Sequence, residues 1–147
     1  MREYLFRGNR KDNGEWIEGY VFDDDLIGSS KVFVGAVVIE NNKITGTFFY
    51  EVIPETVGQF TGLTDKNGKK IFEGDIVHAI YKLGYTGIPD KDFGIGVIRY
   101  NGTYYGGAAY QIDIIGEPGR RVFSASLQVE VIGNIHDNPE LLKGGVE

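Results

Sequence analysis

Residues 59–77 read QFTGLTDKNGKKIFEGDIV, a stretch in which glycines and lysines separate two short apolar runs. It lacks the spacing of a phosphate-binding loop, where two glycines five positions apart precede Lys and a hydroxyl residue at the start of a helix. Asp65-Lys66-Asn67-Gly68 instead favours a tight turn, because Asp can bond the backbone two residues on and Asn-Gly tolerates positive φ. The stretch therefore predicts strands joined by a turn, not a nucleotide site.

The composition of the whole chain also favours strands. Of 147 residues, 22 are glycine and four are proline, and hydrophobic residues make up 41%. Glycine at about twice its usual share implies many tight turns. Nine Tyr and nine Phe, together with abundant Val and Ile, are typical of short twisted strands. We therefore expect a mainly β protein.

Turn-forming residues divide the chain into segments. Lys11–Gly14 and Asn41-Asn42 predict hairpin turns, and Asn101-Gly102 predicts a two-residue loop joining two strands. A cap, a proline and an early acid after Asp137 predict one short C-terminal helix. The first lobe is expected to end near Pro54, which gives domains of residues 1–56 and 57–147. The expected strands are residues 2–7, 16–22, 31–39, 45–53, 75–82, 96–100, 103–115, 121–125 and 128–135.

Charge and residue usage exclude several kinds of protein. The chain has no cysteine, which excludes disulfides, thiol catalysis and thiolate metal sites. It has only two histidines, so a His-rich zinc site is not expected either. The net charge of −6 argues against nucleic-acid binding, which depends on neutralising phosphates with Lys and Arg. No apolar run approaches the ~20 residues of a membrane-spanning helix, and the first residues lack a secretion signal. A cytoplasmic location is expected.

Six blocks of sequence follow one another along nearly the whole chain. In number and order they resemble the YopX family of phage and prophage proteins, and six ordered blocks are far more specific than any single motif. Residues 79–96 look like a variable insertion. The blocks are Phe6-Arg7-Gly8, Asp12-Asn13-Gly14-Glu15-Trp16, Gln59-Phe60-Thr61-Gly62-Leu63, Asp65-Lys66-Asn67-Gly68-Lys69, Phe72-Glu73-Gly74-Asp75-Ile76-Val77, and Val131-Ile132-Gly133-Asn134-Ile135 with Asn138-Pro139-Glu140-Leu141.

The resemblance implies a fold but no chemistry. It suggests an N-terminal β lobe at residues 1–56, then a small Src-homology-type β-barrel at 57–147 with a short C-terminal helix. It brings no established catalytic activity, cofactor or metal. At Gly74-Asp75 we expect a sharp bend in which the carboxylate accepts an N–H from the backbone beyond it.

Tyrosines of the second lobe are the candidate binding residues. They concentrate around the expected Asn101-Gly102 hairpin, where strands could present aromatic faces to a peptide or a base. Because side chains alternate along a strand, roughly half of them belong to the core. The candidates are Tyr81, Tyr85, Tyr100, Tyr104 and Tyr105, with Tyr110 close by.

Two alternative functions use other residues. A nucleic-acid-binding protein would stack bases on the tyrosines and contact phosphates with Lys66, Lys69, Lys70, Arg99, Arg120 and Arg121. A hydrolase would use His78 or His136, with Asp75 or Asp137 as orienting groups and Ser124 or Ser126 as nucleophile, although nothing in the sequence places them together.

The preferred interpretation is a non-catalytic phage or prophage accessory protein. It would bind a phage or host protein in the cytoplasm of the bacterial cell, with the second-lobe tyrosines as its contact surface. The clustered acids Asp23-Asp24-Asp25 are interpreted as an exposed loop and not as a metal site. No cofactor or membrane association is expected, and homo-oligomerisation is left open.

Overall fold

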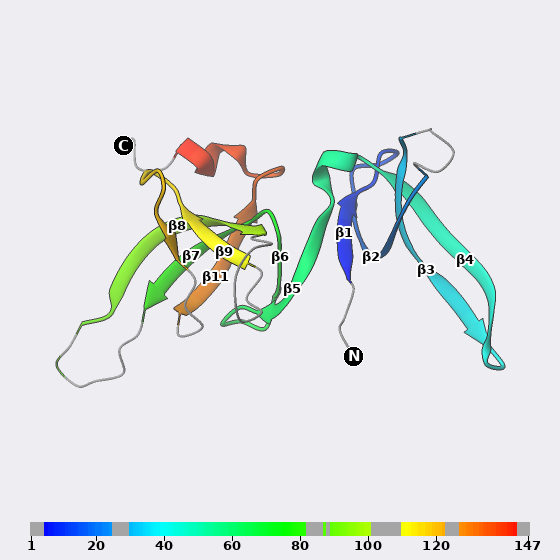
Figure 1. Ribbon diagram of the computed structural model, residues 1–147, viewed down its shortest axis with the longest axis horizontal. Helices are drawn as coiled ribbons and strands as arrows, with labels where there is room; N and C mark the ends of the chain where they lie inside the picture. Colours follow the sequence, from blue (N-terminus) through cyan, green and yellow to red (C-terminus); the bar gives the residue numbers. More distant parts are fainter. Residues whose placement is uncertain are drawn as a thin grey trace. The chain divides into compact units, whose positions relative to one another are not determined.

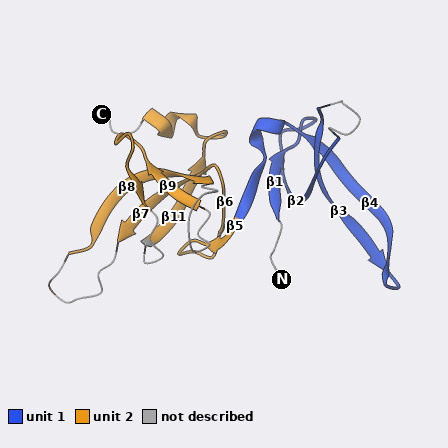
Figure 2. Ribbon diagram, in the orientation of Figure 1, with its two compact units in different colours: residues 1–60 blue, residues 61–147 orange. Residues whose placement is uncertain are grey.

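The computed structural model describes residues 5–24, 30–81, 87, 89–100, 110–122 and 127–143. The chain divides into two compact units, Met1–Phe60 and Thr61–Glu147 (Figure 2). The boundary thus follows Phe60, whereas the sequence placed it after residue 56. The described residues form antiparallel strands and two 3-10 helices (Figure 1), which confirms the prediction of a mainly β protein.

The first unit is built on a meander of antiparallel strands. Its sheet has the order β4-β3-β2-β1-β5, and β5 continues into the second unit, where β6 is its neighbour. The elements are β1 (Phe6–Asn9), β2 (Trp16–Asp23), β3 (Val32–Glu40), β4 (Lys43–Val52), the 3-10 helix η2 (Pro54–Thr56) and β5 (Gly58–Thr64).

Two predicted hairpin turns of this unit are confirmed. Gly14 has φ of 74° and donates its N–H to the Arg10 carbonyl at 2.9 Å, closing the turn between β1 and β2. Asn41 and Asn42 have φ of 51° and 65°, and Glu40 lies opposite Lys43. Positive φ at both central residues is the geometry that a two-residue hairpin loop requires.

The sheet of the first unit curls so that the end of β1 meets the end of β4. Arg10 and Val52 form an isolated β-bridge. On either side of it, the Lys11 N–H donates to the Glu51 carbonyl at 3.0 Å and the Ile53 N–H donates to the Asn9 carbonyl at 2.9 Å. Val52 is completely buried there. These bonds hold together strands that are about forty residues apart in sequence.

The second unit is an open sheet with the order β10-β9-β8-β7-β11. Its core is formed by Ile71, Val77, Ala79, Ile98, Ile112 and Ile114. The elements are β6 (Lys70–Phe72), β7 (Asp75–Tyr81), β8 (Lys91–Tyr100), β9 (Tyr110–Ile114), β10 (Arg121–Val122), β11 (Leu127–Asn134) and the 3-10 helix η3 (Pro139–Lys143).

Two expectations for this unit need correction. The described strands form no closed barrel, because β10 is two residues long and pairs with β9 while β11 pairs with β7 at the other edge. The described residues contain no α-helix either, and the predicted C-terminal helix is a five-residue 3-10 segment. A segment of five residues makes too few backbone hydrogen bonds to offset the free-energy cost of nucleating an α-helix. Among the described residues no helix is long and apolar enough to cross a membrane.

The predicted two-residue loop between β8 and β9 is also wrong. Tyr100 lies opposite Tyr110, and Arg99 lies opposite Gln111. The connection therefore spans residues 101–109, which lie outside the described residues together with Asn101-Gly102. The preference of the Asn-Gly pair for a tight turn is weaker than the constraint on the strand register. That register is set by the burial of Ile98 against Ile112.

The Asp65 carboxylate ties the predicted turn of residues 65–68 to β11. Its Oδ1 accepts hydrogen bonds from the N–H groups of Asn67 and Lys69, both at 2.9 Å. Its Oδ2 accepts one from the Val131 N–H at 3.0 Å. Gly68 has φ of 80°, and the Asp65 side chain is buried, with 7% of the residue exposed. The turn is confirmed, and one carboxylate joins residues 66 positions apart.

A second buried carboxylate shapes the bend at Gly74-Asp75. Asp75 is 1% exposed, and its Oδ2 accepts the Phe72 N–H at 2.8 Å. This bond reaches back three residues, across Gly74. Gly74 also donates its N–H to the Ile98 carbonyl at 2.9 Å. The bend thereby fixes the start of β7 against β8.

We predict that Asp65→Ala lowers the free energy of unfolding by about 3 kcal/mol, because three backbone N–H groups lose a charged acceptor in a buried place. Urea denaturation monitored by circular dichroism would measure the change. Asp90→Ala, at an exposed position, is the control and should change the unfolding free energy little. Equal stability of Asp65→Ala and the parent would contradict this role of the carboxylate.

We also predict that the stability difference between the parent and Asp65→Ala shrinks on acidification. Burial raises the pKa of Asp65, but the Val131, Lys69 and Asn67 N–H groups and the charge of Lys69 bring it below its ordinary value. A lowered folded pKa means that the carboxylate stabilises the fold above its unfolded pKa of about 3.9. That stabilisation is lost as the pH falls through the folded pKa, as unfolding at a series of pH values would show. A difference independent of pH would contradict it.

Candidate functional site

Of the five predicted tyrosines, only Tyr81 and Tyr100 are among the described residues, and these two do not share one surface. Tyr85, Tyr104 and Tyr105 lie outside the described residues. Tyr81 ends β7 opposite Lys91, the first residue of β8, whereas Tyr100 is the last residue of β8. At a rise of about 3.3 Å per residue, the two ends of β8 are roughly 30 Å apart. Tyr81 and Tyr100 therefore belong to opposite ends of the sheet.

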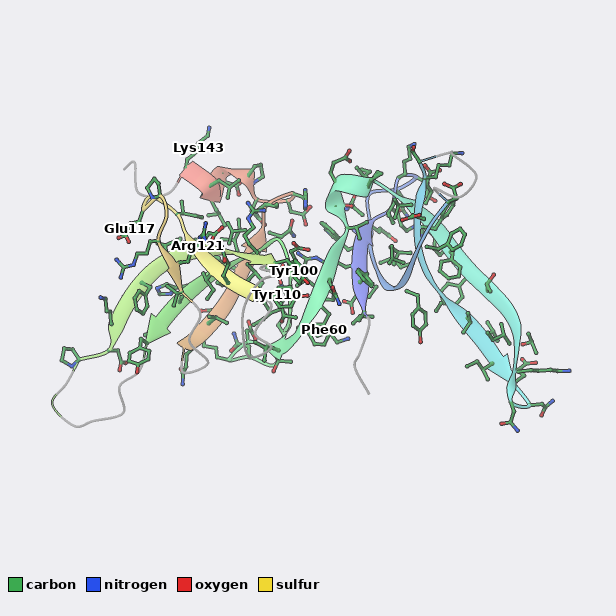
Figure 3. All side chains as sticks on the ribbon, in the orientation of Figure 1. Phe60, Tyr100, Tyr110, Glu117, Arg121 and Lys143 are labelled. Atoms are coloured by element: carbon green, nitrogen blue, oxygen red, sulfur yellow. The ribbon has the colours of Figure 1, made fainter. Side chains whose placement is uncertain are left out.

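One pair from the predicted group is in contact. Tyr100 and Tyr110 pack edge to face, with ring centroids 5.6 Å apart and planes at 68°. Figure 3 shows their side chains together at the ends of β8 and β9. Tyr100 is 56% exposed. Burial raises the pKa of Tyr110, with smaller contributions from the charges of Glu73 and Tyr100. Among the described residues, the pair is a small aromatic contact.

Two of the six basic residues proposed for phosphate binding, Lys66 and Arg120, form ion pairs with acidic residues. Lys66 Nζ lies 3.3 Å from Glu130 Oε2, and Arg120 Nη1 lies 2.7 Å from Glu117 Oε2. The Arg120 guanidinium also packs over the Phe93 ring at 5.2 Å. Such pairing neutralises charges that nucleic-acid binding would need, so the geometry does not favour that alternative.

The groups proposed for hydrolysis are not brought together. His78 Nε2 lies 2.9 Å from Asp92 Oδ1, so Asp92 is the carboxylate at the imidazole. The pKa of Asp92 is lowered by the Gly94 N–H and then by His78. His136 is exposed in the turn after β11, and Ser124 and Ser126 lie outside the described residues. In the described part of the chain no three His, Cys, Asp or Glu side chains are placed to hold a metal.

A larger aromatic surface lies on the first unit. Opposite residues in an antiparallel pair project to the same side of the sheet. Phe22 lies opposite Phe33, and Gly35 lies opposite both Tyr20 on β2 and Phe49 on β4. We call the surface formed by Tyr20, Phe22, Phe33 and Phe49 the aromatic face.

The aromatic face is open and hollowed. Tyr20 and Phe22 are each 56% exposed, and the rings of Phe22 and Phe33 are 6.5 Å apart at 52°. A hollow of about 560 Å³ is lined by Phe22, Phe33, Thr47, Phe48 and Phe49. Gly35 lies in the middle of the face, and a side chain there would collide with the Phe48 carbonyl. The close approach of β3 and β4 thus requires glycine at this position.

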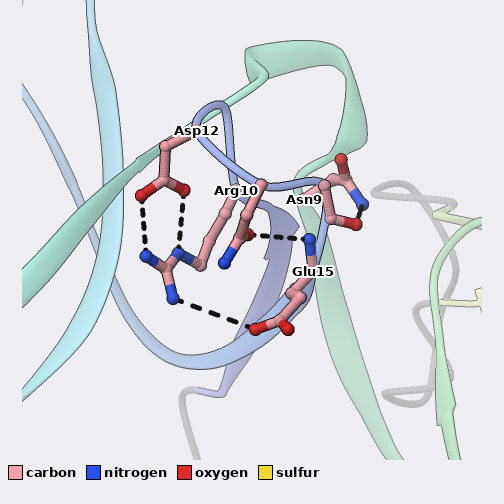
Figure 4. Close-up of polar contacts among 6 residues, drawn as sticks. Asn9, Arg10, Asp12 and Glu15 are labelled. Atoms are coloured by element: carbon pink, nitrogen blue, oxygen red, sulfur yellow. Dashed lines mark hydrogen bonds and ion pairs between the residues drawn. The ribbon is translucent and has the colours of Figure 1, made fainter.

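A polar cluster lies in the β1–β2 turn of the same unit (Figure 4). The Arg10 guanidinium donates two hydrogen bonds to Asp12, Nε to Oδ1 at 3.0 Å and Nη2 to Oδ2 at 2.7 Å, and it stacks on the Tyr50 ring at 3.8 Å. The hydrogen bonds from Arg10 lower the pKa of Asp12. Nearby, Lys11 Nζ lies 3.1 Å from Glu51 Oε2. The β1–β2 turn is thereby fastened to the end of β4.

Sequence analysis assigned these aromatic residues to strands but not to a site. One signal was available, because residues 32–39 are apolar almost without interruption. Such a run predicts a strand that is covered on both faces. Yet Val38, Ile39 and Phe48 remain more than 40% exposed in the β3–β4 hairpin. Apolar side chains are thus left exposed on both sides of this hairpin, and the side that carries Phe22 and Phe33 is the aromatic face.

Comparison with known proteins identifies a family and a similar solved structure. The family model described as YopX protein matches residues 5–143. The chain is similar to the crystal structure of protein EF1440 from Enterococcus faecalis, with 23% sequence identity, a TM-score of 0.49, and coverage of 97% of this chain and 99% of that chain. None of the curated proteins matches the sequence.

We predict that Arg10→Lys lowers the thermal midpoint of the protein. Lysine keeps the charge but cannot bond Asp12 through two parallel N–H groups while stacking flat on Tyr50. Differential scanning calorimetry would measure the change. Arg99→Lys, at an exposed position of β8, is the matched control and should leave the midpoint unchanged. An equal midpoint for Arg10→Lys and the parent would show that the cluster does not stabilise the first unit.

Proposed function

The chain belongs to the YopX family, and we propose that it is a non-catalytic phage or prophage accessory protein that binds a protein partner through its aromatic face. The observation that carries this proposal is the exposure of Tyr20 and Phe22 on one side of the sheet, where Phe22 lines the hollow between β2, β3 and β4. Large exposed aromatic side chains around a depression are typical of protein-binding surfaces.

The size of the exposed aromatic area supports a role in binding. An aromatic side chain presents about 150–250 Å², so the exposed parts of Tyr20 and Phe22 amount to on the order of 200 Å². The ring edges of Phe33 and Phe49 add to this area within the hollow. An apolar side chain of a partner would be desolvated on several sides there, as the anchor residues of interfaces are.

The charges around the aromatic face indicate the chemistry of the partner. Glu18 alternates with Tyr20 and Phe22 along β2, and Glu51 lies opposite Phe33, so both carboxylates project to the same side as the rings. Acidic residues beside an aromatic surface repel phosphates and attract cations. Glu51 is already paired with Lys11, so we infer that the face takes a protein segment mainly through an apolar anchor and not a nucleic acid.

The placement of the titratable groups supports a role without catalysis. Among the described residues, His78 meets Asp92 on the second unit, while the hollow on the first unit is lined by apolar side chains and one threonine. A catalytic site would bring an activated nucleophile or a general base into such a hollow. The aromatic face offers contact area instead of reactive groups.

We predict that Phe22→Asp reduces capture of the partner at least about tenfold while the protein stays folded, because a carboxylate at an anchor position removes the apolar contact and adds an unpaired charge. The parent and the variants would be immobilised and exposed to lysate of phage-induced host cells, and the captured proteins quantified by mass spectrometry. Thermal melts would verify folding, since Phe22 is more than half exposed.

Val38→Asp is the matched control. Val38 is 41% exposed on the same hairpin, and it projects to the opposite side of the sheet from Phe22 and Phe33. It should capture the same protein as the parent. Equal capture by Phe22→Asp would refute the aromatic face as the binding surface, and retardation of DNA or RNA at low salt would favour the nucleic-acid alternative.

A further inference from the structure

The outer edge of β4 is the most unusual feature that the proposed function leaves unused. This ten-residue strand is the last in its sheet, and in the described part of the chain no strand pairs with its outer side. Its only charged residues are Lys43 at the start and Glu51 near the end, and it contains no proline. Natural edge strands are usually short, charged or interrupted, because an open edge recruits other strands.

The direction of the backbone groups on this edge can be deduced from its far end. The Glu51 carbonyl and the Ile53 N–H bond Lys11 and Asn9, so they point away from β3. Backbone groups alternate in direction along a strand. The regular pairing of β3 and β4 from Val38 to Val32 therefore turns the N–H and C=O groups of Phe49 and Thr47 to the same outer side.

We propose that the outer edge of β4 pairs with β4 of a second copy, antiparallel and about a two-fold axis near Thr47. The outward N–H and C=O groups of Thr47 would then bond those of Thr47 in the second copy. The covered stretch is Ile44–Tyr50, because the β1 end already occupies the edge from Glu51 onward. The sheets of two first units would become one continuous sheet.

Charge along the strand favours a second copy of this chain as the occupant. Antiparallel pairing brings Lys43 of each copy to the end of β4 that carries Glu51 of the other, and Ile44–Tyr50 contains no charge to oppose itself. Glu51 already binds Lys11 through Oε2, which leaves its other carboxylate oxygen for Lys43 of the second copy. Like charges would repel in the parallel arrangement, so the strand is complementary to itself only when reversed.

Apolar side chains beside the edge supply further area for this contact. Phe48 is 47% exposed and Ile44 is 62% exposed, and both lie within the covered stretch. With the axis at Thr47, Gly46 falls opposite Phe48 of the second copy, whose ring gains room above the glycine.

The dimer would also extend the aromatic face. Residues opposite each other in an antiparallel pair project to one side, so Thr47 of both copies and the rings of both aromatic faces would lie on the same side of the continuous sheet. The inference nevertheless stands apart from the proposed function, because strand pairing requires no partner protein. Purified protein alone tests it, and its failure would leave partner binding through the aromatic face unaffected.

The experiment measures the mass of purified protein by sedimentation equilibrium. The parent should reach twice the chain mass of 16.3 kDa. Thr47→Pro removes an outward N–H without removing a β3–β4 hydrogen bond, and Thr47→Lys places two like charges at the axis. Each should weaken dimerisation at least about tenfold. A monomeric parent, or dimers of unchanged affinity in both variants, would overturn the proposal.

A chemical cross-link tests the position of the axis and remains informative if Thr47→Pro fails to fold. The chain has no cysteine, so Thr47→Cys introduces a single thiol. A short bis-maleimide should link Thr47→Cys into a covalent dimer in high yield. Glu117→Cys, at an exposed turn of the second unit, is the control and should remain monomeric after the same treatment. Equal yields from the two variants would contradict pairing through β4.

Discussion

The pairing between the end of β1 and the end of β4 is the constraint on which the first unit depends. Two backbone hydrogen bonds flank the Arg10–Val52 bridge, and the guanidinium of Arg10 adds contacts to Asp12 and Tyr50. This pairing curls the sheet and buries Val52. It also covers the outer edge of β4 only from Glu51 onward, so the rest of that edge and the aromatic face stay open.

The two units differ in how they stabilise a small β core. The second unit uses two buried carboxylates, Asp65 and Asp75, to satisfy backbone N–H groups where the chain turns, and it packs aliphatic side chains behind them. A charged acceptor binds an N–H more strongly than a neutral one, which fixes sharp turns without a large core. The first unit keeps few side chains fully buried and leaves aromatic residues in solvent. Its surface is therefore the one suited to recognition.

The candidate site shows that local sequence patterns do not predict which residues share a surface. Tyrosine clustering in the sequence pointed to the second unit, but the register of β7 and β8 places Tyr81 and Tyr100 at opposite ends of the sheet. The aromatic face combines Tyr20, Phe22, Phe33 and Phe49 from three strands. Proximity in sequence is a poor guide to a shared surface in a sheet, because each residue of separation along a strand adds about 3.3 Å.

The sequence by itself determined the turns at Lys11–Gly14, Asn41-Asn42 and Asp65–Gly68, the mainly β composition and the family, because these depend on the conformational preferences of few residues or on ordered motifs. The tertiary structure alone decided that Asn101-Gly102 does not directly join β8 to β9, that the second sheet stays open, and which apolar strand lacks a cover. These outcomes depend on register and on which side of a sheet finds a partner. A shift of one residue reverses every side chain, and such a choice is made by contacts between distant segments.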